Sequence, residues 1–381
     1  MLPSFYQVSL EAQLNEIQLI TLQMLVELLQ TERRVSIERL AMLFAQPILF
    51  HSRRKNIQRF LNLPIISPET LWFPIVLDWI QRHFHRQSSL CLVIDRTQWS
   101  KQNVLMVSVL YKNQTVPVFW MLLDKRGQSN LAEQQAVLTP VFELLADYDL
   151  VLLGDREFHG VPFASWLMQQ SITFVLRLPK STTVQLTDQS EFERLDALSL
   201  EPGMSQFEFQ IQVTQTQGFG KFNLVTRWKR TYRDSATDQI WYLLTNLEDP
   251  DTALKLYRKR FRIEPMFRTY KRGGYDLEAC HANAKRTTAL LVLIALAYTI
   301  SLDQGRRIRA KQVQPYIVRP KEIDRRVNRH TDFWIGLYGQ VWLIATDVWA
   351  KWAQPLMRLK PQKRLYFLRG LRALSLIQSA F

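Results

Sequence analysis

The sequence predicts an α/β protein in which a sheet-forming region lies between two helical regions. Three observations predict it. Residues 1–87 carry apolar side chains at helical spacing, residues 89–179 alternate strand-like runs with helical ones, and the chain beyond residue 247 returns to helical patterns. With 381 residues, 47% of them apolar, the chain is long enough for two or three domains with sizeable cores.

The region 1–87 contains a candidate DNA-binding element. Ser36–Leu61 reads as two helices separated by a break at Pro47. Such a pair is compatible with a helix-turn-helix whose second helix presents basic residues to DNA. The basic residues of that second helix are Arg53, Arg54, Lys55 and Arg59. Many small helical pairs have this pattern, so a purely structural pair is the alternative.

Five strand-like runs rich in β-branched and aromatic residues follow. They are Ser89–Asp95, Val104–Tyr111, Val116–Asp124, Asp149–Asp155 and Ile172–Pro179. Helical segments are predicted over 130–148 and 161–170. The resulting order, β-β-β-α-β-α-β, is that of an RNase H-like fold.

Residues 179–238 interrupt this pattern. Phe207–Val213 and Phe222–Arg230 alternate apolar and polar residues with period two, which predicts a half-exposed antiparallel sheet. Ile240–Leu247 returns to a buried strand. We therefore expect a helical domain over 1–87, an RNase H-like domain over 88–302 with a β-rich insertion over 179–238, and a basic helical tail over 303–381.

The charge of the chain predicts a polyanionic partner. The net charge is +15 and the pI is about 9.9, which favours nucleic acid or an anionic membrane surface. Residues 306–381 hold 16 Lys and Arg against 4 Asp and Glu, and residues 255–272 hold 8 against a single acid. Such blocks suit contacts with phosphates. A solvated basic surface is the alternative for either block alone.

Several other classes of protein are not indicated. Cys91 and Cys280 belong to no CxxC pair, so no zinc site is signalled, and both are expected as reduced thiols. The N-terminus lacks the pattern of a signal peptide. The uncharged stretch Thr287–Leu302 has 16 residues, short of the ~20 that span a bilayer, so we expect a buried core helix and no membrane contact. A cytoplasmic location follows as the expectation.

Two aspartates stand at the ends of predicted strands. Asp95 ends the first strand and Asp155 ends the fourth. In an RNase H-like sheet these strands are adjacent and parallel, so their carboxyl ends open onto one crevice. Two carboxylates there repel each other unless a cation lies between them, and Mg²⁺ or Mn²⁺ takes such oxygen ligands. A turn or cap role is the alternative for either aspartate alone.

A third carboxylate lies in a basic segment. Tyr257, Arg260 and Lys271 stand at offsets of −7, −4 and +7 from Glu264, which predicts that all four share one face of a helix. Pro265 opposes this prediction, because an interior proline removes a hydrogen bond. Either the helix bends there or a new helical turn begins.

These residues resemble a known family. The pattern Tyr-x2-Arg-x3-Glu-x6-Lys is similar to the signature of DDE transposases of the insertion-sequence-four group, which includes the transposon-five transposase. Asp155-Arg156-Glu157 resembles the segment around the second aspartate of that family. Trp241-Tyr-Leu-Leu-Thr resembles the strand whose tryptophan stacks on a flipped base. The β-rich insertion is also a family trait, and the resemblance spans roughly residues 30 to 300.

The resemblance implies roles for individual residues. Those that bind Mg²⁺ or Mn²⁺ are Asp95, Asp155 and Glu264. Those that contact phosphates near the element's end are Tyr257, Arg260 and Lys271. Trp241 stacks on an extruded base, and Arg156 and Arg177 are further candidate DNA contacts.

The implied activity is cut-and-paste transposition through a hairpin intermediate. The expected partners are double-stranded DNA, as element ends and as target, and a second protomer in a homodimer on DNA. The bacterial nucleoid is the implied location. Two alternatives stay open: an RNase H-like DNA nuclease without strand transfer, and a non-catalytic DNA-binding regulator derived from a transposase.

Overall fold

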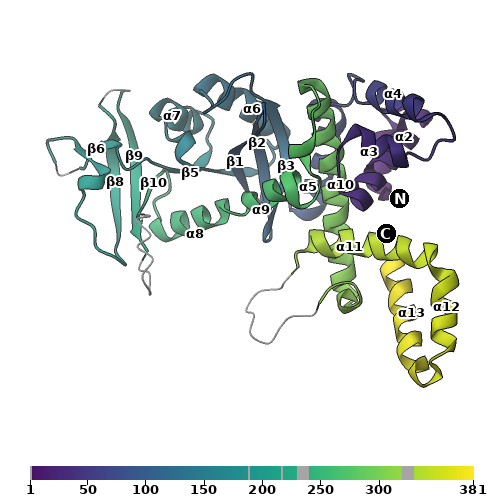
Figure 1. The fold of residues 1–381 in the computed structure, drawn as a ribbon. Helices are drawn as coiled ribbons and strands as arrows, with labels where there is room; N and C mark the ends of the chain where they lie inside the picture. Colours follow the sequence, from purple (N-terminus) through teal and green to yellow (C-terminus); the bar gives the residue numbers. More distant parts are fainter. Residues whose placement is uncertain (1, 188, 216–217, 230–239, 320–329) are drawn as a thin grey trace. The chain divides into compact units, whose positions relative to one another are not determined.

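The chain divides into two compact units in the computed structural model (Figure 1), which describes residues 2–187, 189–215, 218–229, 240–319 and 330–381. The sheet unit comprises Val76–Arg268. The helical unit comprises Met1–Ile75 together with Thr269–Phe381. The helical unit is therefore built from both ends of the chain, and the sheet unit from its middle.

The described residues of the sheet unit form one ten-stranded sheet, in the order β3-β2-β1-β4-β5-β10-β9-β8-β6-β7. The strands are β1 (Ser89–Trp99), β2 (Gln102–Tyr111), β3 (Gln114–Leu122), β4 (Asp149–Gly154), β5 (Thr173–Arg177), β6 (Thr183–Gln185), β7 (Glu193–Arg194), β8 (Ser205–Val213), β9 (Gly220–Trp228) and β10 (Ile240–Thr245).

The first five strands confirm the predicted RNase H-like order. β1, β2 and β3 form an antiparallel meander, while β4 pairs in parallel with both β1 and β5. Helices α6 (Leu131–Leu144) and α7 (Val161–Gln169) make the crossovers, and right-handed crossovers in one direction place both on the same face. In Figure 1, α6 and α7 lie above the strands, and α8 (Pro250–Arg260) and α9 (Ile263–Arg268) lie below them.

The strands of the predicted insertion continue the same sheet. β10 pairs antiparallel with β5, and β9 and β8 follow in antiparallel order. The two predicted strands are present and antiparallel, but the predicted half-exposed alternation is not: Ser205 to Gln210 of β8 are all half-buried or exposed, and Phe222 to Thr226 of β9 are all buried. The predicted strand end at Arg230 and the rest of 230–239 lie outside the described residues.

The helices of the helical unit are α1 (Ser4–Glu11), α2 (Glu16–Glu32), α3 (Ile37–Leu43), α4 (Phe50–Phe60), α10 (Ala284–Ala310), α11 (Asp332–Val348), α12 (Ala350–Arg358) and α13 (Arg364–Gln378). Helix α5 (Phe73–His83) begins in this unit and ends in the sheet unit. The helix pair predicted around Pro47 is present as α3 and α4. On it, Arg54 pairs with Glu38 at 2.8 Å.

Helix α10 is the centre of the helical unit. By length and composition it would suffice to cross a membrane, but 94% of its most apolar stretch is buried inside the protein, which confirms the predicted core helix. Its backbone touches α11 directly: a Cβ at Gly305 would lie 1.7 Å from the Asp332 carbonyl oxygen, and one at Gly336 would lie 1.8 Å from that of Ser301. Only glycine permits this crossing.

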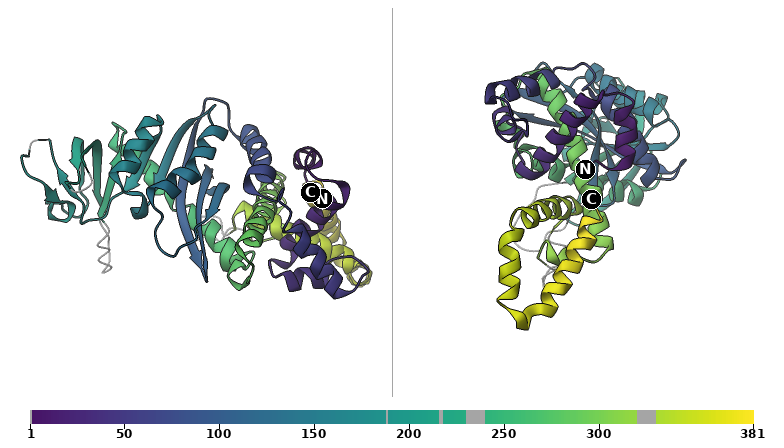
Figure 2. Two further views of the ribbon diagram at one scale, coloured as in Figure 1. Left: turned by 90° about the horizontal axis from the view of Figure 1, so that it is seen from above. Right: turned by 90° about the vertical axis from the view of Figure 1, so that its right-hand side faces the viewer.

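The two ends of the chain share this core. The Tyr6 hydroxyl donates to Thr299 Oγ1 at 2.7 Å, and Gln30 Nε2 donates to Ser301 Oγ at 3.0 Å, both buried. Helices α1 and α2 are therefore joined to α10 by polar contacts as well as by apolar packing. Figure 2 shows the ribbon from two further directions.

The basic tail is helical over its described residues. It contains the end of α10, then α11, α12 and α13. Residues 320–329, which include the predicted break at Pro320 and four of the basic residues, lie outside the described part of the chain.

Candidate active site

The two predicted aspartates lie side by side because of how β1 and β4 pair. The parallel register runs from Ser89 opposite Asp149 to Ile94 opposite Gly154, so Asp95 and Asp155 follow the last matched pair. One detail of the prediction is wrong: β1 does not end at Asp95 but continues to Trp99. The reason is its antiparallel pairing with β2, which continues five residues beyond the point where β4 stops.

Asp95 is a mostly buried carboxylate, with 13% of its side chain exposed. Its Oδ1 accepts from the backbone N–H of Arg96 at 2.8 Å, and its Oδ2 pairs with the Arg260 guanidinium at 3.3 Å. Burial, and next the negative charge of Asp155, raise the pKa of Asp95 to about 7, although the Arg260 charge opposes the rise. The free protein thus holds a carboxylate where its charged form is unfavourable.

Asp155 is held by the turn that it begins. Its Oδ1 accepts from the backbone N–H of Glu157 at 2.9 Å and so caps the short 3-10 turn Arg156–Phe158. The preceding Gly154 lets this turn lie directly on β5, because a Cβ there would lie 2.8 Å from a methyl of Leu176 and 3.0 Å from the Cβ of Phe158. The backbone therefore fixes where the Asp155 carboxylate stands.

Glu264 is brought to the same place by a helix break. Helix α8 ends at Arg260 and α9 begins at Ile263. The single helical face predicted for Tyr257, Arg260, Glu264 and Lys271 is therefore wrong. Of the two alternatives considered for Pro265, a new helical turn begins, and proline is tolerated there because first-turn N–H groups have no intrahelical partner.

Arg260 joins two of the three carboxylates. Its guanidinium pairs with Asp95 Oδ2 at 3.3 Å and with Glu264 Oε1 at 3.1 Å. Arg260 itself is buried, whereas the Glu264 side chain is half exposed, at 52%. The negative charges of Asp155 and Glu264 also both raise the pKa of Asp95. The carboxylates thus form one electrostatic group, with Arg260 as its counter-charge.

The chemistry of this donor set fits a hard divalent cation. It consists of carboxylate oxygens, which Mg²⁺ and Mn²⁺ prefer. Burial first, and the charge of Asp155 second, raise the pKa of Asp95, so a bound cation would stabilise its charged form. Among the described residues, no three His, Cys, Asp or Glu side chains are yet close enough to hold an ion. Binding would therefore require these carboxylates to come closer together.

A fourth carboxylate, Glu157, supports the site through its contacts with Arg96 and Ser129. The sequence analysis did not predict this role. Its Oε2 accepts from Arg96 Nε at 2.7 Å, and its Oε1 accepts from the Ser129 backbone N–H and hydroxyl at 2.8 and 2.7 Å. Arg96 also donates to Asn103 Oδ1 at 3.0 Å. The Arg96–Glu157 ion pair thus connects the strand that carries Asp95 to the turn that begins at Asp155. Its position in the Asp-Arg-Glu tripeptide was the available signal.

The remaining predicted contacts in the sheet unit form an aromatic and basic cluster. Trp241 packs edge-on against Tyr257, with ring centroids 5.0 Å apart, and stacks on Phe261 at 6.0 Å. Tyr257 is fully buried, and this burial raises the pKa of its hydroxyl. Arg177 lies beside that hydroxyl and is only 8% exposed, and burial lowers its pKa. Trp241 is half-buried.

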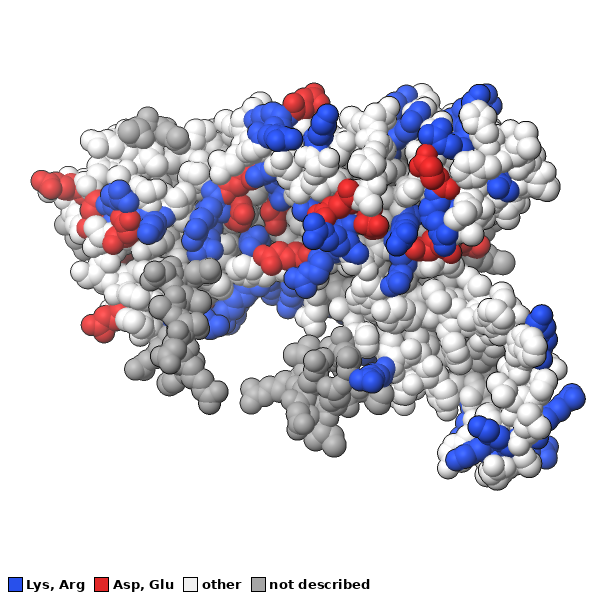
Figure 3. All heavy atoms as spheres, viewed as in Figure 1, with Lys and Arg blue, Asp and Glu red and all other residues white. Residues whose placement is uncertain are grey.

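The other predicted DNA contacts are distributed over both units. Arg156 is exposed in the turn after Asp155. Lys271, Arg53 and Arg54 belong to the helical unit: Lys271 is half-buried, and Arg53 and Arg54 lie half-buried on α4. Figure 3 shows Lys and Arg side chains around the acidic side chains on the face it draws.

Comparisons with known proteins identify the family of the chain. Residues 86–300, more than half of the chain, match the family described as Transposase DDE domain. Among solved structures, a cryo-EM structure of a piggyBac transposase synaptic complex with hairpin DNA is similar, with a TM-score of 0.47 and 13% identity over 89% of this chain and 76% of that one. No curated protein matches. From the family match, this chain belongs to the DDE transposases.

Proposed function

We propose that the chain is an active DNA transposase that cuts and rejoins strands at the ends of a mobile element, with Asp95, Asp155 and Glu264 as its catalytic residues. One observation carries this proposal. Asp95 and Asp155 follow the last matched pair of two adjacent parallel strands, and Arg260 joins Asp95 to Glu264. Transposases of this family depend on divalent metal ions.

The three carboxylates would hold two Mg²⁺ or Mn²⁺ ions. When bound, such ions supply Lewis-acid activation of the attacking oxygen and stabilise the leaving oxygen. The residues of the chain orient the carboxylates and bind the DNA. The caps on Asp95 and Asp155 orient their carboxylates, and the Arg96–Glu157 pair keeps the two strand ends together. Arg260, once released from the carboxylates, is free to pair with a phosphate.

We assign DNA contacts to the basic and aromatic residues around the site. Tyr257, Arg260 and Lys271 would contact phosphates of the element's end, with Arg156 and Arg177 beside them. Arg53 and Arg54 on α4 would contact DNA elsewhere. Since Arg177 is almost completely buried, its contribution would be to hold Tyr257 in place as much as to meet a phosphate.

The finer assignment is to the insertion-sequence-four group, with a hairpin intermediate. It is supported by the Tyr-Arg-Glu-Lys spacing and by Trp241, which lies in β10 against Tyr257. A hairpin requires one strand to fold back sharply, and a flipped base held on an aromatic ring relieves that strain. Paired ends in one complex would also require a homodimer on DNA.

A cleavage assay with an end-bearing DNA duplex tests this function. We expect nicking that requires Mg²⁺ or Mn²⁺, followed by hairpin formation and strand transfer into target DNA. Nicking without transfer would favour the RNase H-like nuclease, and DNA binding without nicking would favour the regulator.

Trp241 gives a sharper test of the hairpin route. Trp241→Ala should slow hairpin formation about tenfold or more, because base–aromatic stacking is worth ~1–3 kcal/mol, and should leave first-strand nicking nearly unchanged. Trp228→Ala, a half-buried tryptophan on the neighbouring β9, is the matched control. Equal loss of both steps with a lower melting temperature would mean that Trp241 only packs against Tyr257 and Phe261.

A further inference from the structure

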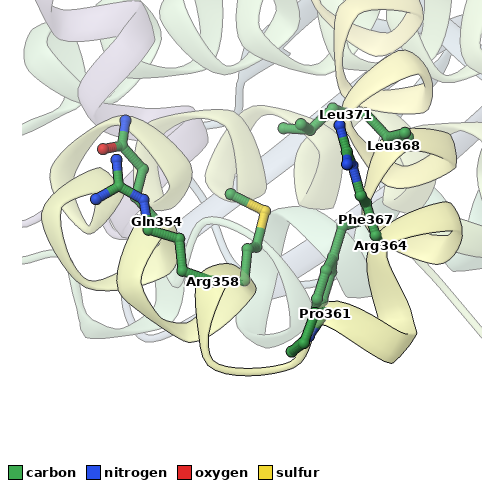
Figure 4. A pocket seen from close by; sticks show the side chains of 8 residues that line it. Gln354, Arg358, Pro361, Arg364, Phe367, Leu368 and Leu371 are labelled. Atoms are coloured by element: carbon green, nitrogen blue, oxygen red, sulfur yellow. The ribbon is translucent and has the colours of Figure 1, made fainter.

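The helical unit has apolar side chains at its surface in two places. One is the groove between α12 and α13, lined by Leu368 and Leu371 among others (Figure 4). The other is the loop between α3 and α4, where Ile48, Leu49 and Phe50 are 42%, 79% and 44% exposed. A run of consecutive exposed apolar residues is unfavourable in water unless it has a function. The loop is therefore a candidate binding surface.

The protein holds this loop against α4. We call residues 47–50 the apolar tip. Gln46, which precedes it, contacts α4 twice: its Oε1 accepts from Asn56 Nδ2 at 3.1 Å, and its backbone oxygen accepts from Arg53 Nη1 at 3.4 Å. Pro47 restricts the backbone further, because its ring fixes φ. A partner of the apolar tip would thus not have to order it on binding, which favours affinity.

The surroundings of the apolar tip are basic. Residues 33–59 contain seven Lys and Arg and a single acid, Glu38. Glu38 is paired with Arg54, at 2.8 Å. Figure 3, seen from the same side as Figure 1, shows Lys and Arg side chains gathered where α4 lies. Charge complementarity therefore favours a polyanion as the partner, and for a DDE transposase that polyanion is DNA.

The basic residues continue from the apolar tip along one side of α4. His51, Lys55 and Arg59 are exposed and recur every fourth residue, whereas Ile57 and Phe60 are buried. Four residues turn a helix by about 400°, so the three exposed side chains lie within about 80° of each other and extend ~12 Å along the axis. Lys55 and Arg59 are thus placed to contact phosphates in addition to the Arg53 and Arg54 assigned above.

We propose that the apolar tip recognises thymine C5-methyl groups in the major groove of the element's end, with Leu49 as its main contact. The major groove admits an α-helix, and the thymine methyl is the apolar group that its floor presents. Phosphates line the rims of the groove, where Lys55 and Arg59 would bind them. The inference rests on the proposed transposase function and deepens it, because it names the chemical feature of the DNA that the helical unit reads.

Duplexes of the element's end that carry either thymine or deoxyuridine test the proposal, because deoxyuridine lacks only the C5-methyl group. We expect the full-length protein to bind the deoxyuridine duplex about tenfold more weakly, as for roughly two lost methyl contacts. Leu49→Ala should bind the thymine duplex about fivefold more weakly and should lose less than about threefold on deoxyuridine. Ile17→Ala, which changes a 76% exposed residue on α2, is the matched control and should keep the wild-type response.

Lys55→Gln separates phosphate binding from methyl recognition. It should weaken binding to both duplexes equally and lower the slope of log affinity against log salt by about one. All three variants should keep the wild-type melting temperature, because the changed side chains are exposed.

Two outcomes would overturn the proposal. One is equal binding of both duplexes by the wild-type protein, and the other is an undiminished thymine preference in Leu49→Ala. Metal-dependent nicking of the same end in either case would show that only methyl recognition, and not the transposase function, is wrong. A thymine preference that Leu49→Ala removes, in a protein that never nicks, would support methyl recognition and contradict the catalytic function.

Discussion

The carboxylate site and the C-terminal hairpin (residues 349–378) both hold side chains in unfavourable surroundings, but of opposite kinds. At the site, charged groups are buried, and the pKa of Asp95 rises to about 7 as a result. On the hairpin, apolar groups face water, and Leu359 is 76% exposed. The difference teaches that the fold accepts two opposite costs in two places: buried charge at the carboxylate site and exposed apolar surface on the hairpin.

The largest expected effect is at Asp155. Asp155→Ala should reduce metal-dependent cleavage by at least ~10³-fold, since metal assistance supplies several kcal/mol to the transition state. DNA affinity should stay within a few-fold of wild type. Asp149→Ala, at the exposed opposite end of the same strand β4, is the control and should cleave normally. Full cleavage by Asp155→Ala would refute the assignment of that residue.

The burial of Asp95 should be measurable as stability. Because its folded pKa lies above the unfolded value, the folded state binds the proton more tightly, and stability is lost as pH rises from about 4 to about 7. Asp95→Asn removes this cost. In metal-free urea denaturation it should raise the free energy of unfolding at pH 8 by at most ~4 kcal/mol, and by less at pH 5. An unchanged or lower stability at pH 8 would contradict a strained carboxylate.

A smaller effect is expected at Glu157, which supports the three carboxylates of the proposed site through Arg96. Glu157→Gln leaves Arg96 without its counter-charge and loosens the two strand ends. We expect the Mg²⁺ or Mn²⁺ concentration for half-maximal cleavage to rise ten- to hundredfold. Calorimetric titration with Ca²⁺ should show the same weakening in the absence of catalysis. Glu133→Gln, whose carboxylate pairs with Lys125, is the control, and equal midpoints for both variants would make Glu157 a packing residue.

The smallest effect concerns the basic flanks of the hairpin. Replacing Lys351, Lys360 and Lys363 with Gln should lower the slope of log affinity against log salt by roughly one to three, if each contacts a phosphate. Cutting the tail at Arg306 is a poorer test, because α10 continues to Ala310. The triple Lys→Arg variant keeps the charge and should keep the slope. An unchanged slope in the Gln variant would show that these lysines of the hairpin do not contact DNA phosphates.

The sequence was sufficient for the first five strands of the sheet and for the pairing of two aspartates. Long strand-like runs with clear limits specify strand order, and adjacent parallel strands place Asp95 next to Asp155 without further information. The helix break before Glu264 was harder, because Pro265 is compatible with both a kink and a new helix. Glu157 was missed because its role depends on Arg96, which lies 61 positions away and has no periodic relation to it.

The exposed hairpin was beyond sequence reasoning for a different reason. An apolar stripe in a helix has the same pattern whether it faces its own core or a partner. The intervals at Trp352, Leu356 and Leu359 would fit a core helix equally well. Only the accessible area of these side chains in the folded chain separates the two cases.

The helical unit also determines when folding can finish during synthesis. The partners of Tyr6 and Gln30 are Thr299 and Ser301, which lie 293 and 271 positions later in the chain. At roughly 5–20 residues per second, α1 and α2 wait for about 14 to 59 seconds after their own synthesis. The whole sheet unit, which ends at Arg268, has been synthesised before that wait ends. A product truncated before α10 therefore leaves the apolar side of α2 uncovered.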